Sequence, residues 1–263
     1  MKILISNDDG IGANGLRVLA ETLADEHEVY VVAPNQERSA AGHSLTLYTP
    51  LRVEEVQAYG GVKKRWKTTG TPGDCVKMAI CAILNEDEQP DLVISGINHG
   101  PNFGSDILYS GTVSCAMEGA MMGIPSIAVS LASNKFEEND FKFGALFIKG
   151  LIRKLKNYEF MPKTLLNINI PGLPQEDISG IAVVPLGDRT YTNTYEKRID
   201  PRGKVYYWLA GELIKNSDET ETDIAAVRNN KISITPISYD MTCKKSMKDL
   251  YKLVCSEGNC IWY

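Results

Sequence analysis

The chain has 263 residues, of which 43% are hydrophobic and 23% are charged, so it can form one large domain or two modest ones with the composition of an ordinary globular enzyme. Its formal net charge of −5 argues against general electrostatic binding to nucleic acid or to an acidic membrane surface. No stretch approaches the roughly 20 apolar residues of a membrane span, and polar residues interrupt the first apolar run too early for a signal peptide. We therefore expect a cytoplasmic protein that binds neither nucleic acid nor a membrane.

Short runs rich in β-branched residues alternate with helical patterns in the first part of the chain. Strands are expected at 2–6, 28–33, 91–95, 126–130 and 165–170, and helices at 16–23, 74–84, 112–122 and 141–156. Two further strands, at 51–56 and 62–69, flank Gly60-Gly61 and indicate an antiparallel hairpin that follows a polar loop at 35–49. This order predicts an α/β fold with a mainly parallel sheet and helices on both faces.

The composition changes after about residue 185. Residues 188–208 are rich in Tyr, Arg and Thr and poor in aliphatic side chains, which indicates an extended hairpin arm that cannot make its own core. A helix at 223–227, a strand at 231–236 and a last helix at 246–255 follow. We expect a core over 1–185 and a C-terminal part over 186–263 with an arm, a strand and a tail helix, joined in one continuous unit.

The cysteines do not indicate a metal site. All six are scattered without a CxxC pair, and only three histidines are present, so a zinc site is not expected. We expect reduced thiols that lie mostly in the core. A pairing of Cys255 with Cys260 stays open.

Two adjacent carboxylates, Asp8 and Asp9, directly follow the first strand. The carboxyl ends of parallel strands are where α/β sheets bind ligands, and a divalent cation is the usual way to hold two like charges together. Ser39 follows the second strand, and Asn98 follows the strand at 91–95, so further hard oxygen donors reach the same edge. Such donors suit Mg²⁺ or Mn²⁺, which keep several waters and accept a substrate phosphate.

A candidate phosphate-binding loop, Ser110-Gly111-Thr112, stands just before a predicted helix. Free backbone N–H groups at a helix start, two hydroxyls and a glycine that allows close approach suit a phosphate. Together with the metal this predicts metal-assisted phosphoester hydrolysis. Each residue also has a structural alternative: Asp8 or Asp9 as a helix cap, Thr112 as an N-cap, Ser39 as an ordinary loop residue and Asn98 as a turn residue.

Two other functions share some of these features. Residues 10–15 match GxGxxG, the fingerprint of an NAD-binding oxidoreductase, but two carboxylates precede the first glycine and no acid ends the second strand. A receiver-like regulatory module also carries an acidic pair after its first strand and binds Mg²⁺. It needs an acceptor aspartate at the end of a later strand, where this chain has Ser95-Gly96-Ile97-Asn98.

The chain closely resembles the SurE survival-protein family of acid phosphatases and nucleotidases. The matching segments run in order over almost the whole chain: 3–10 (ILISNDDG), 31–34 (VVAP) with Arg38-Ser39, 44–46 (SLT), 70–75 (GTPGDC), 95–102 (SGINHGPN), 109–113 (YSGTV), 118–119 (EG) and 233–236 (SITP). The resemblance implies a Rossmann-like core and a C-terminal arm or tail that is exchanged between subunits in a homodimer or homotetramer.

The resemblance also implies an activity and a set of residues. The activity is hydrolysis of nucleoside 5′- and 3′-monophosphates with one divalent cation, Mg²⁺ or Mn²⁺, per subunit. By motif position, Asp8, Asp9, Ser39 and Asn98 become the metal ligands, and Ser110, Gly111 and Thr112 the phosphate-binding loop. We expect Asp8 and Asp9 to be the catalytic residues; which of them serves as base, nucleophile or ligand only is left open.

Overall fold

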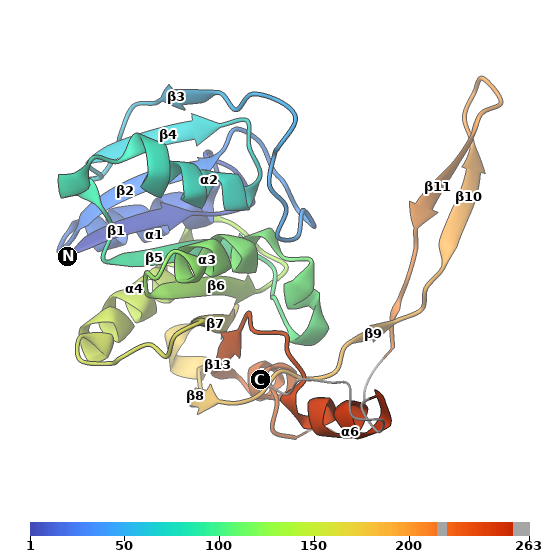
Figure 1. Cartoon of the computed structure of the whole chain (residues 1–263). Coiled ribbons are helices and arrows are strands. Elements are labelled where there is room, and N and C mark those ends of the chain that lie inside the picture. The colour runs from blue at the N-terminus through green and yellow to red at the C-terminus, as the bar shows by residue number, and fades with distance from the viewer. Residues whose placement is uncertain (215–219, 255–263) are drawn as a thin grey trace.

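The structure is a computed structural model that describes residues 1–214 and 220–254 (Figure 1). Its core is a nine-stranded sheet in the order β3-β4-β2-β1-β5-β6-β7-β13-β8. The neighbouring strands are parallel except for the β3–β4 and β7–β13 pairs. The strands are β1 (Lys2–Ser6), β2 (Glu28–Pro34), β3 (Val53–Glu55), β4 (Lys64–Thr68), β5 (Leu92–His99), β6 (Ser126–Ala132), β7 (Thr164–Pro171), β8 (Gly180–Val183) and β13 (Lys231–Ser238).

Helices cover both faces of this sheet (Figure 1). On one face lie α1 (Asn14–Ala24) and α4 (Glu138–Leu155), and on the other lie α2 (Pro72–Met78) and α3 (Gly111–Met121). The predicted α/β fold with a mainly parallel sheet is therefore confirmed. The other helical segments of the described residues, apart from α6 (Lys244–Val254) near the C-terminal end, are the π-helical turn Ala79–Ile83, the 3-10 turns Glu86–Glu88, Gly104–Leu108 and Gln175–Asp177, and α5 (Asp223–Arg228).

Local sequence explains why these elements form. The buried residues of α1 recur at helical spacing as Leu16, Leu19 and Leu23, which gives the helix one apolar face against the sheet. At the start of α2, the Thr71 hydroxyl accepts a hydrogen bond from the backbone N–H of Asp74, while the Asp74 carboxylate accepts one from the backbone N–H of Thr71. This reciprocal capping begins the helix where the sequence supplies Pro72 at a first-turn position.

The order of the strands fixes where a ligand can bind. From β1 the chain proceeds to β2 and then to β4 on one side, and it later returns to the other side of β1 to form β5 and β6. The β1–β5 pair is therefore a topological switch point, the place where sheets of this kind bind ligands at the carboxyl ends of their strands. Of the predicted metal ligands, Asp8 and Asp9 lie in the loop after β1, and Asn98 lies near the end of β5.

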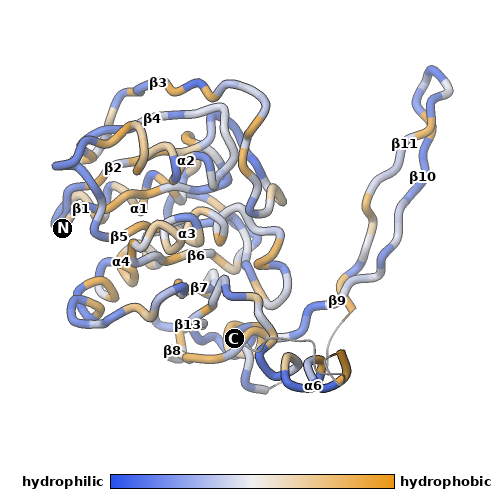
Figure 2. The backbone as a smooth tube through the Cα atoms, viewed as in Figure 1, coloured by the Kyte–Doolittle hydropathy of each residue, from blue (hydrophilic) through white to orange (hydrophobic). Residues whose placement is uncertain are grey.

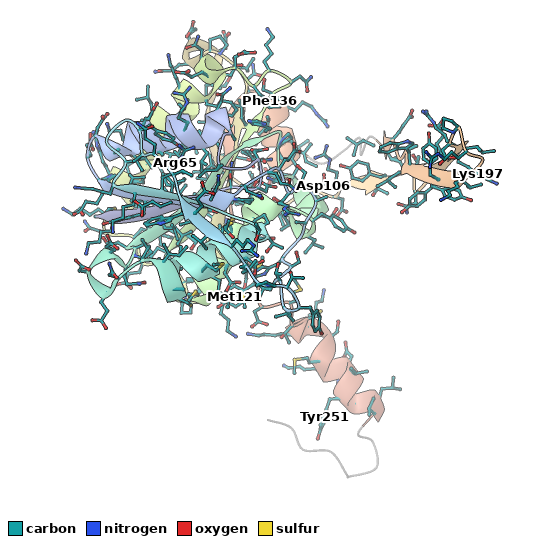
Figure 3. All side chains as sticks on the ribbon, turned by 90° about the horizontal axis from the view of Figure 1, so that it is seen from above. Arg65, Asp106, Met121, Phe136, Lys197 and Tyr251 are labelled. Atoms are coloured by element: carbon teal, nitrogen blue, oxygen red, sulfur yellow. The ribbon has the colours of Figure 1, made fainter. Side chains whose placement is uncertain are left out.

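The arm and the last helix extend away from the sheet. The arm consists of β9 (Thr190–Tyr191), the hairpin β10 (Tyr195–Ile199) with β11 (Val205–Leu209), and β12 (Leu213–Ile214), which pairs with β9. Figure 2 shows mixed hydropathy along the arm, with hydrophilic residues at its tip. In Figure 3 the arm, near Lys197, and α6 (Lys244–Val254), near Tyr251, leave the body of the protein in different directions.

Most expected elements are present, with shifted ends. The strand expected at 91–95 continues to His99, and the helix expected at 74–84 is α2 followed by the π-helical turn. The strand β13 joins the sheet formed by the first 185 residues, and the expected division of the chain at 185/186 stays a prediction. Of the described cysteines, Cys75 and Cys115 are buried and Cys81 and Cys243 are exposed; all four are free thiols, and the open Cys255–Cys260 pairing lies outside the described residues.

Membrane-spanning helices were not expected. Among the helices that the structure describes, none has the length and apolar character needed to cross a bilayer.

Candidate active site

Three loops meet at the carboxyl ends of β1, β2 and β5. The backbone N–H of Arg38 donates to the carbonyl oxygen of Asp8 at 2.8 Å, which joins the loop after β2 to the loop after β1. The backbone N–H of His99 donates to the Asp9 carboxylate at 3.2 Å, which joins the end of β5 to the same loop. These hydrogen bonds show that the ends of the three strands lie together, as the sequence predicts.

The turn that carries the two carboxylates is built by Asn7 and Gly10. The Asn7 side chain accepts from the backbone N–H of Gly10 at 3.2 Å and donates to its carbonyl oxygen at 3.1 Å. Gly10 has φ +99°, which favours glycine. Helix α1 begins after this turn at Asn14, and its N-cap residue, Ala13, makes no side-chain hydrogen bond. Neither Asp8 nor Asp9 therefore caps α1, and that structural alternative is wrong.

The carboxylate of Asp8 lies under the start of α3. Asp8 is only 5% exposed, and it accepts a hydrogen bond from the Thr112 hydroxyl at 2.6 Å. Burial raises the pKa of Asp8, and hydrogen bonding from the Thr112 hydroxyl and backbone opposes that rise. A buried carboxylate with a raised pKa gains from a nearby cation, which would favour its charged form.

The carboxylate of Asp9 faces the end of β5. Its side chain is 7% exposed, and one oxygen lies 3.5 Å from Nδ1 of His99. Burial, followed by the charge of Asp8, raises the pKa of Asp9 to about 7. The His99 ring stacks on Phe136, with 4.9 Å between the ring centroids, and this contact holds His99 beside the carboxylate. Desolvation lowers the pKa of His99, so the ring is a weak source of positive charge.

The predicted phosphate-binding loop forms the first turn of α3. Ser110 is the N-cap, and its hydroxyl accepts from the backbone N–H of Val113 at 3.0 Å. Thr112 is therefore not the N-cap; its hydroxyl bonds Asp8 instead. Gly111 passes so close to Asp8 that a Cβ there would lie 2.6 Å from the Asp8 Cβ. The N-terminus of α3 thus stands beside the two carboxylates, and the backbone of Thr112 also hydrogen-bonds Asp8.

The structure orients the two other predicted ligands differently. The amide nitrogen of Asn98 donates to the carbonyl oxygens of His99 and Gly100, at 3.4 and 2.8 Å, which leaves the amide oxygen free of hydrogen bonds to the described residues. The Ser39 hydroxyl donates to the Glu37 carboxylate at 2.6 Å. The Ser39 loop reaches Asp8 through Arg38, but the Ser39 hydroxyl is directed at Glu37.

Sequence reasoning missed Glu37. Its negative charge raises the pKa of both Asp8 and Asp9, so it is a third acidic group near the pair. Glu37 stands in an exposed polar loop without periodicity or motif, and no signal in the sequence separates it from an ordinary surface glutamate. Its position near the two aspartates depends on the backbone hydrogen bond from Arg38 to Asp8.

The donor set fits a hard divalent cation. No lysine or arginine within 1–214 and 220–254 forms an ion pair with Asp8 or Asp9, although Asp8 is buried and the Asp9 side chain is only 7% exposed. The same described residues contain no group of three or more His, Cys, Asp or Glu side chains placed to hold a metal, so the pair would rely on amide, hydroxyl and water oxygens for the other positions. Mg²⁺ and Mn²⁺ accept such a set, whereas a zinc site does not.

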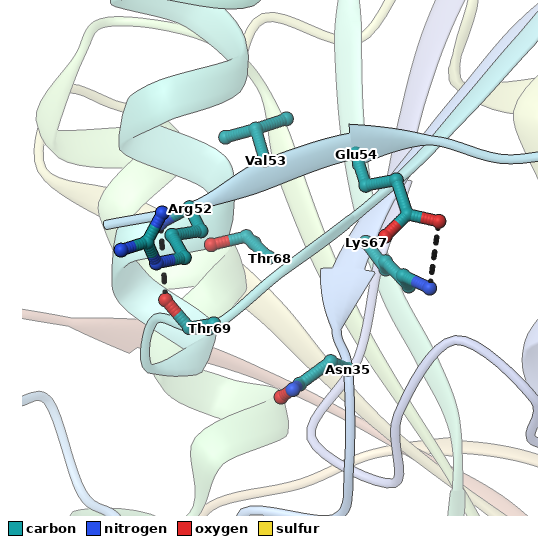
Figure 4. Close-up of a pocket in the computed structure, with 7 residues that line it drawn as sticks. All are labelled: Asn35, Arg52, Val53, Glu54, Lys67, Thr68 and Thr69. Atoms are coloured by element: carbon teal, nitrogen blue, oxygen red, sulfur yellow. Dashed lines mark hydrogen bonds and ion pairs between the residues drawn. The ribbon is translucent and has the colours of Figure 1, made fainter. Parts of the chain in front are cut away.

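A separate pocket of about 460 Å³ opens beside β3 and β4 (Figure 4). It is lined by Asn35, Arg52, Val53, Glu54, Lys67, Thr68 and Thr69. Lys67 and Glu54 form an ion pair of 2.9 Å within it. None of the predicted site residues lines this pocket, and it is distinct from the carboxylate pair.

Comparisons with known proteins agree with the geometry. The family described as "Survival protein SurE" matches residues 3–193. The proteins described as 5′-nucleotidase SurE from Thermosynechococcus vestitus and Pelotomaculum thermopropionicum are each 50% identical to the chain; the matches cover 95% and 97% of it and 95% of each relative.

Solved structures give the same result. The crystal structure of the SurE protein from Aquifex aeolicus is 42% identical, covers 95% of this chain and 98% of its own, and has a TM-score of 0.80. The resemblance predicted from short motifs thus holds over nearly the full length in both sequence and fold. The chain belongs to the SurE survival-protein family.

Proposed function

We propose that the chain is a metal-dependent phosphohydrolase that removes phosphate from nucleoside 5′-monophosphates, and also from 3′-monophosphates. The observation that carries this is the Asp8–Asp9 pair beside the first turn of α3, in which Asp8 is buried and the Asp9 side chain is 7% exposed. The relatives' description as 5′-nucleotidases supports the substrate class.

Asp8, Asp9 and Asn98 would hold one Mg²⁺ or Mn²⁺ ion, with the Ser39 hydroxyl turning to it from Glu37. When bound, the ion supplies charge to polarise the phosphoryl group and to lower the pKa of a water. The chain's own part is to place the phosphate. The N-terminus of α3 and the Ser110 hydroxyl would stabilise negative charge on the phosphate oxygens, joined by the Thr112 hydroxyl when it turns from Asp8.

The proton transfer would fall to Asp9. Its carboxylate is oriented by the hydrogen bond from the backbone N–H of His99. The Asp8 carboxylate already accepts the Thr112 hydroxyl, so Asp8 would serve as a ligand of the metal ion. This division of labour is our proposal for the two catalytic aspartates.

A substrate panel tests the proposed function. Phosphate release would be measured from 5′- and 3′-nucleoside monophosphates, short polyphosphate and p-nitrophenyl phosphate, each with and without chelator. We expect the highest kcat/KM on nucleoside monophosphates and loss of activity with chelator. Activity that resists chelator, or no activity on any of these compounds, would reject the proposal.

The receiver-like alternative predicts a different product. A regulatory module would keep the phosphoryl group as a stable phosphoprotein when incubated with a small phosphodonor, whereas a hydrolase releases it to water. The structure places no carboxylate of β5 at the site, since that strand ends in Asn98 and His99. The NAD-binding alternative requires the Gly10 turn to face a pyrophosphate, yet Asp8 and Asp9 stand there instead.

We propose that the arm joins subunits into a homodimer or homotetramer. In the β10–β11 register, Tyr195 lies opposite Leu209 and Ile199 lies opposite Val205, with Tyr207 between them on the same face. These five side chains are between 48% and 70% exposed, and a two-stranded hairpin is marginal without a partner. The helix α6 also exposes an apolar stripe, which includes Leu250, Leu253 and Val254.

Replacing Tyr207 and Leu209 with aspartate should shift the protein to a smaller species, because the charges would disrupt the apolar face of the arm. Light scattering coupled to size exclusion measures the mass. Glu196→Gln, on the opposite face of the hairpin, is the matched control and should keep the wild-type mass. A wild-type protein that is already monomeric would contradict the proposed role of the arm.

A further inference from the structure

The loop after β2, residues 35–49, has no helix or strand but is fastened at several points. The backbone N–H of Gly42 donates to the carbonyl oxygen of Tyr109 at 3.0 Å, beside the first turn of α3. The Thr71 hydroxyl donates to the carbonyl oxygen of Ser44 at 2.6 Å, and the backbone N–H of Thr46 donates to Asp74 at 3.1 Å. The loop is thus held against the starts of both α2 and α3.

One side chain of this loop enters the protein. The His43 side chain is 25% exposed, and its Nε2 lies 2.8 Å from the carboxylate of Glu118, which is 2% exposed. The other oxygen of Glu118 lies 2.7 Å from the ammonium of Lys77 on α2. The His43 ring also lies against α2, since a Cβ on Gly73 would be 3.4 Å from its Cδ2. A single buried carboxylate therefore joins the loop, α2 and α3.

Glu118 stands two helical turns after Gly111 in the same helix, so whatever it holds is fixed relative to the phosphate-binding turn. The hydrogen bond from His43, followed by the Lys77 ammonium, lowers the pKa of Glu118 and keeps the carboxylate charged. A buried charge of this kind needs its partners, because an unpaired carboxylate in the interior is costly.

We propose that His43 is a positioning residue: through Glu118 it fixes the loop that carries Ser39 relative to Asp8, Asp9 and the start of α3, and so raises the affinity of the site for its divalent cation. This inference rests on the proposed function. Side chains that orient metal ligands without touching the metal typically change metal affinity by about 10–100-fold. Since Gly42, Ser44 and Thr46 keep their own hydrogen bonds, loss of the His43 side chain should loosen the loop without unfolding the protein.

Three variants separate positioning from mere stability. His43→Ala removes the contact from the loop, and His43→Gln restores an amide donor that can reach Glu118. Lys77→Ala removes a charge partner of the same carboxylate but leaves the loop attached. Mn²⁺ affinity is measured by calorimetric titration, loop mobility by hydrogen exchange of residues 38–46, and stability by thermal melting, with kcat and KM as a further readout.

We expect His43→Ala to raise the Kd for Mn²⁺ by about 10-fold and to speed exchange in the loop, with kcat at saturating Mn²⁺ within about threefold of wild type. His43→Gln should recover most of the affinity. Lys77→Ala should lower the Tm but keep the wild-type Kd. The inference is overturned if His43→Ala lowers the Tm as Lys77→Ala does while its Kd is unchanged. Wild-type protein that neither binds Mn²⁺ nor hydrolyses a nucleotide would overturn the proposed function together with this inference.

Discussion

The Asp9→Asn variant should lose about 100-fold or more of the wild-type kcat at saturating Mn²⁺, because metal-assisted charge stabilisation contributes several kcal/mol to such reactions. Asparagine keeps the size of the side chain and can still accept from the backbone N–H of His99. It removes both the negative charge toward the metal and the proposed base. Steady-state phosphate release measures the effect, and turnover within a factor of a few of wild type would contradict the assignment.

The same substitution should stabilise the metal-free protein above neutral pH. Burial and the charge of Asp8 raise the pKa of Asp9 from 3.8 to about 7, so the folded state favours the neutral acid. Between those two values the folded state binds more protons than the unfolded chain, and stability falls as pH rises. Asparagine cannot ionise and escapes this loss.

Thermal melting in chelator from pH 4 to pH 8 tests the direction of this pH dependence of stability. The Tm advantage of Asp9→Asn over wild type should grow with pH and level off above about pH 7. Asp87→Asn, at an exposed position, is the matched control and should show no such trend. A constant difference between Asp9→Asn and wild type across this range would argue against a buried, destabilised carboxylate. Added Mn²⁺ should raise the Tm of wild type more than that of Asp9→Asn.

The second large effect is expected from Gly111→Ala. A Cβ at this position would lie 2.6 Å from the Asp8 Cβ, 2.8 Å from its Oδ2 and 2.9 Å from the Pro72 Cγ. Asp8, the first turn of α3 or both must therefore move. Misplacement of catalytic groups by about 1 Å can cost about 100-fold in rate. We expect a drop of that size in kcat/KM, although alanine suits the helix better than glycine does.

Gly150→Ala is the matched control for this variant. Gly150 lies inside α4, where a Cβ would meet nothing within 4 Å. Alanine there should keep wild-type activity and stabilise the protein by about 0.5–1 kcal/mol. If Gly111→Ala also kept wild-type kcat/KM, the close approach of α3 to Asp8 would not matter for catalysis.

Much of the fold could be predicted because its elements are long and periodic. The central strands are short apolar runs, and α1 and α4 carry one apolar face each, so local patterns alone identify them. The strands β8 and β12 were missed. β12 has only two residues, and β8 alternates half-buried with exposed positions beside β13. Their pairing depends on the rest of the sheet and leaves little trace in the local sequence.

The part of the site that lies at the ends of strands could be predicted from the sequence. Because carboxyl ends of parallel strands share one edge, the convergence of Asp8, Asp9 and Asn98 follows from topology. The direct contact between Thr112 and Asp8 does not, since 104 residues separate them. The same holds for His43 and Glu118, which are 75 residues apart. Side-chain pairs of this kind depend on packing between elements, which no periodicity encodes.

Phosphate release from adenosine 5′-monophosphate, measured on chelator-treated protein before and after Mn²⁺ is restored, tests most directly whether Asp8 and Asp9 act through a metal ion. We expect chelation to lower the rate by about 100-fold or more and added Mn²⁺ to restore it in wild type but not in Asp9→Asn. Full activity in excess chelator, or equal recovery of wild type and Asp9→Asn, would contradict the claim that the two aspartates act through a metal ion.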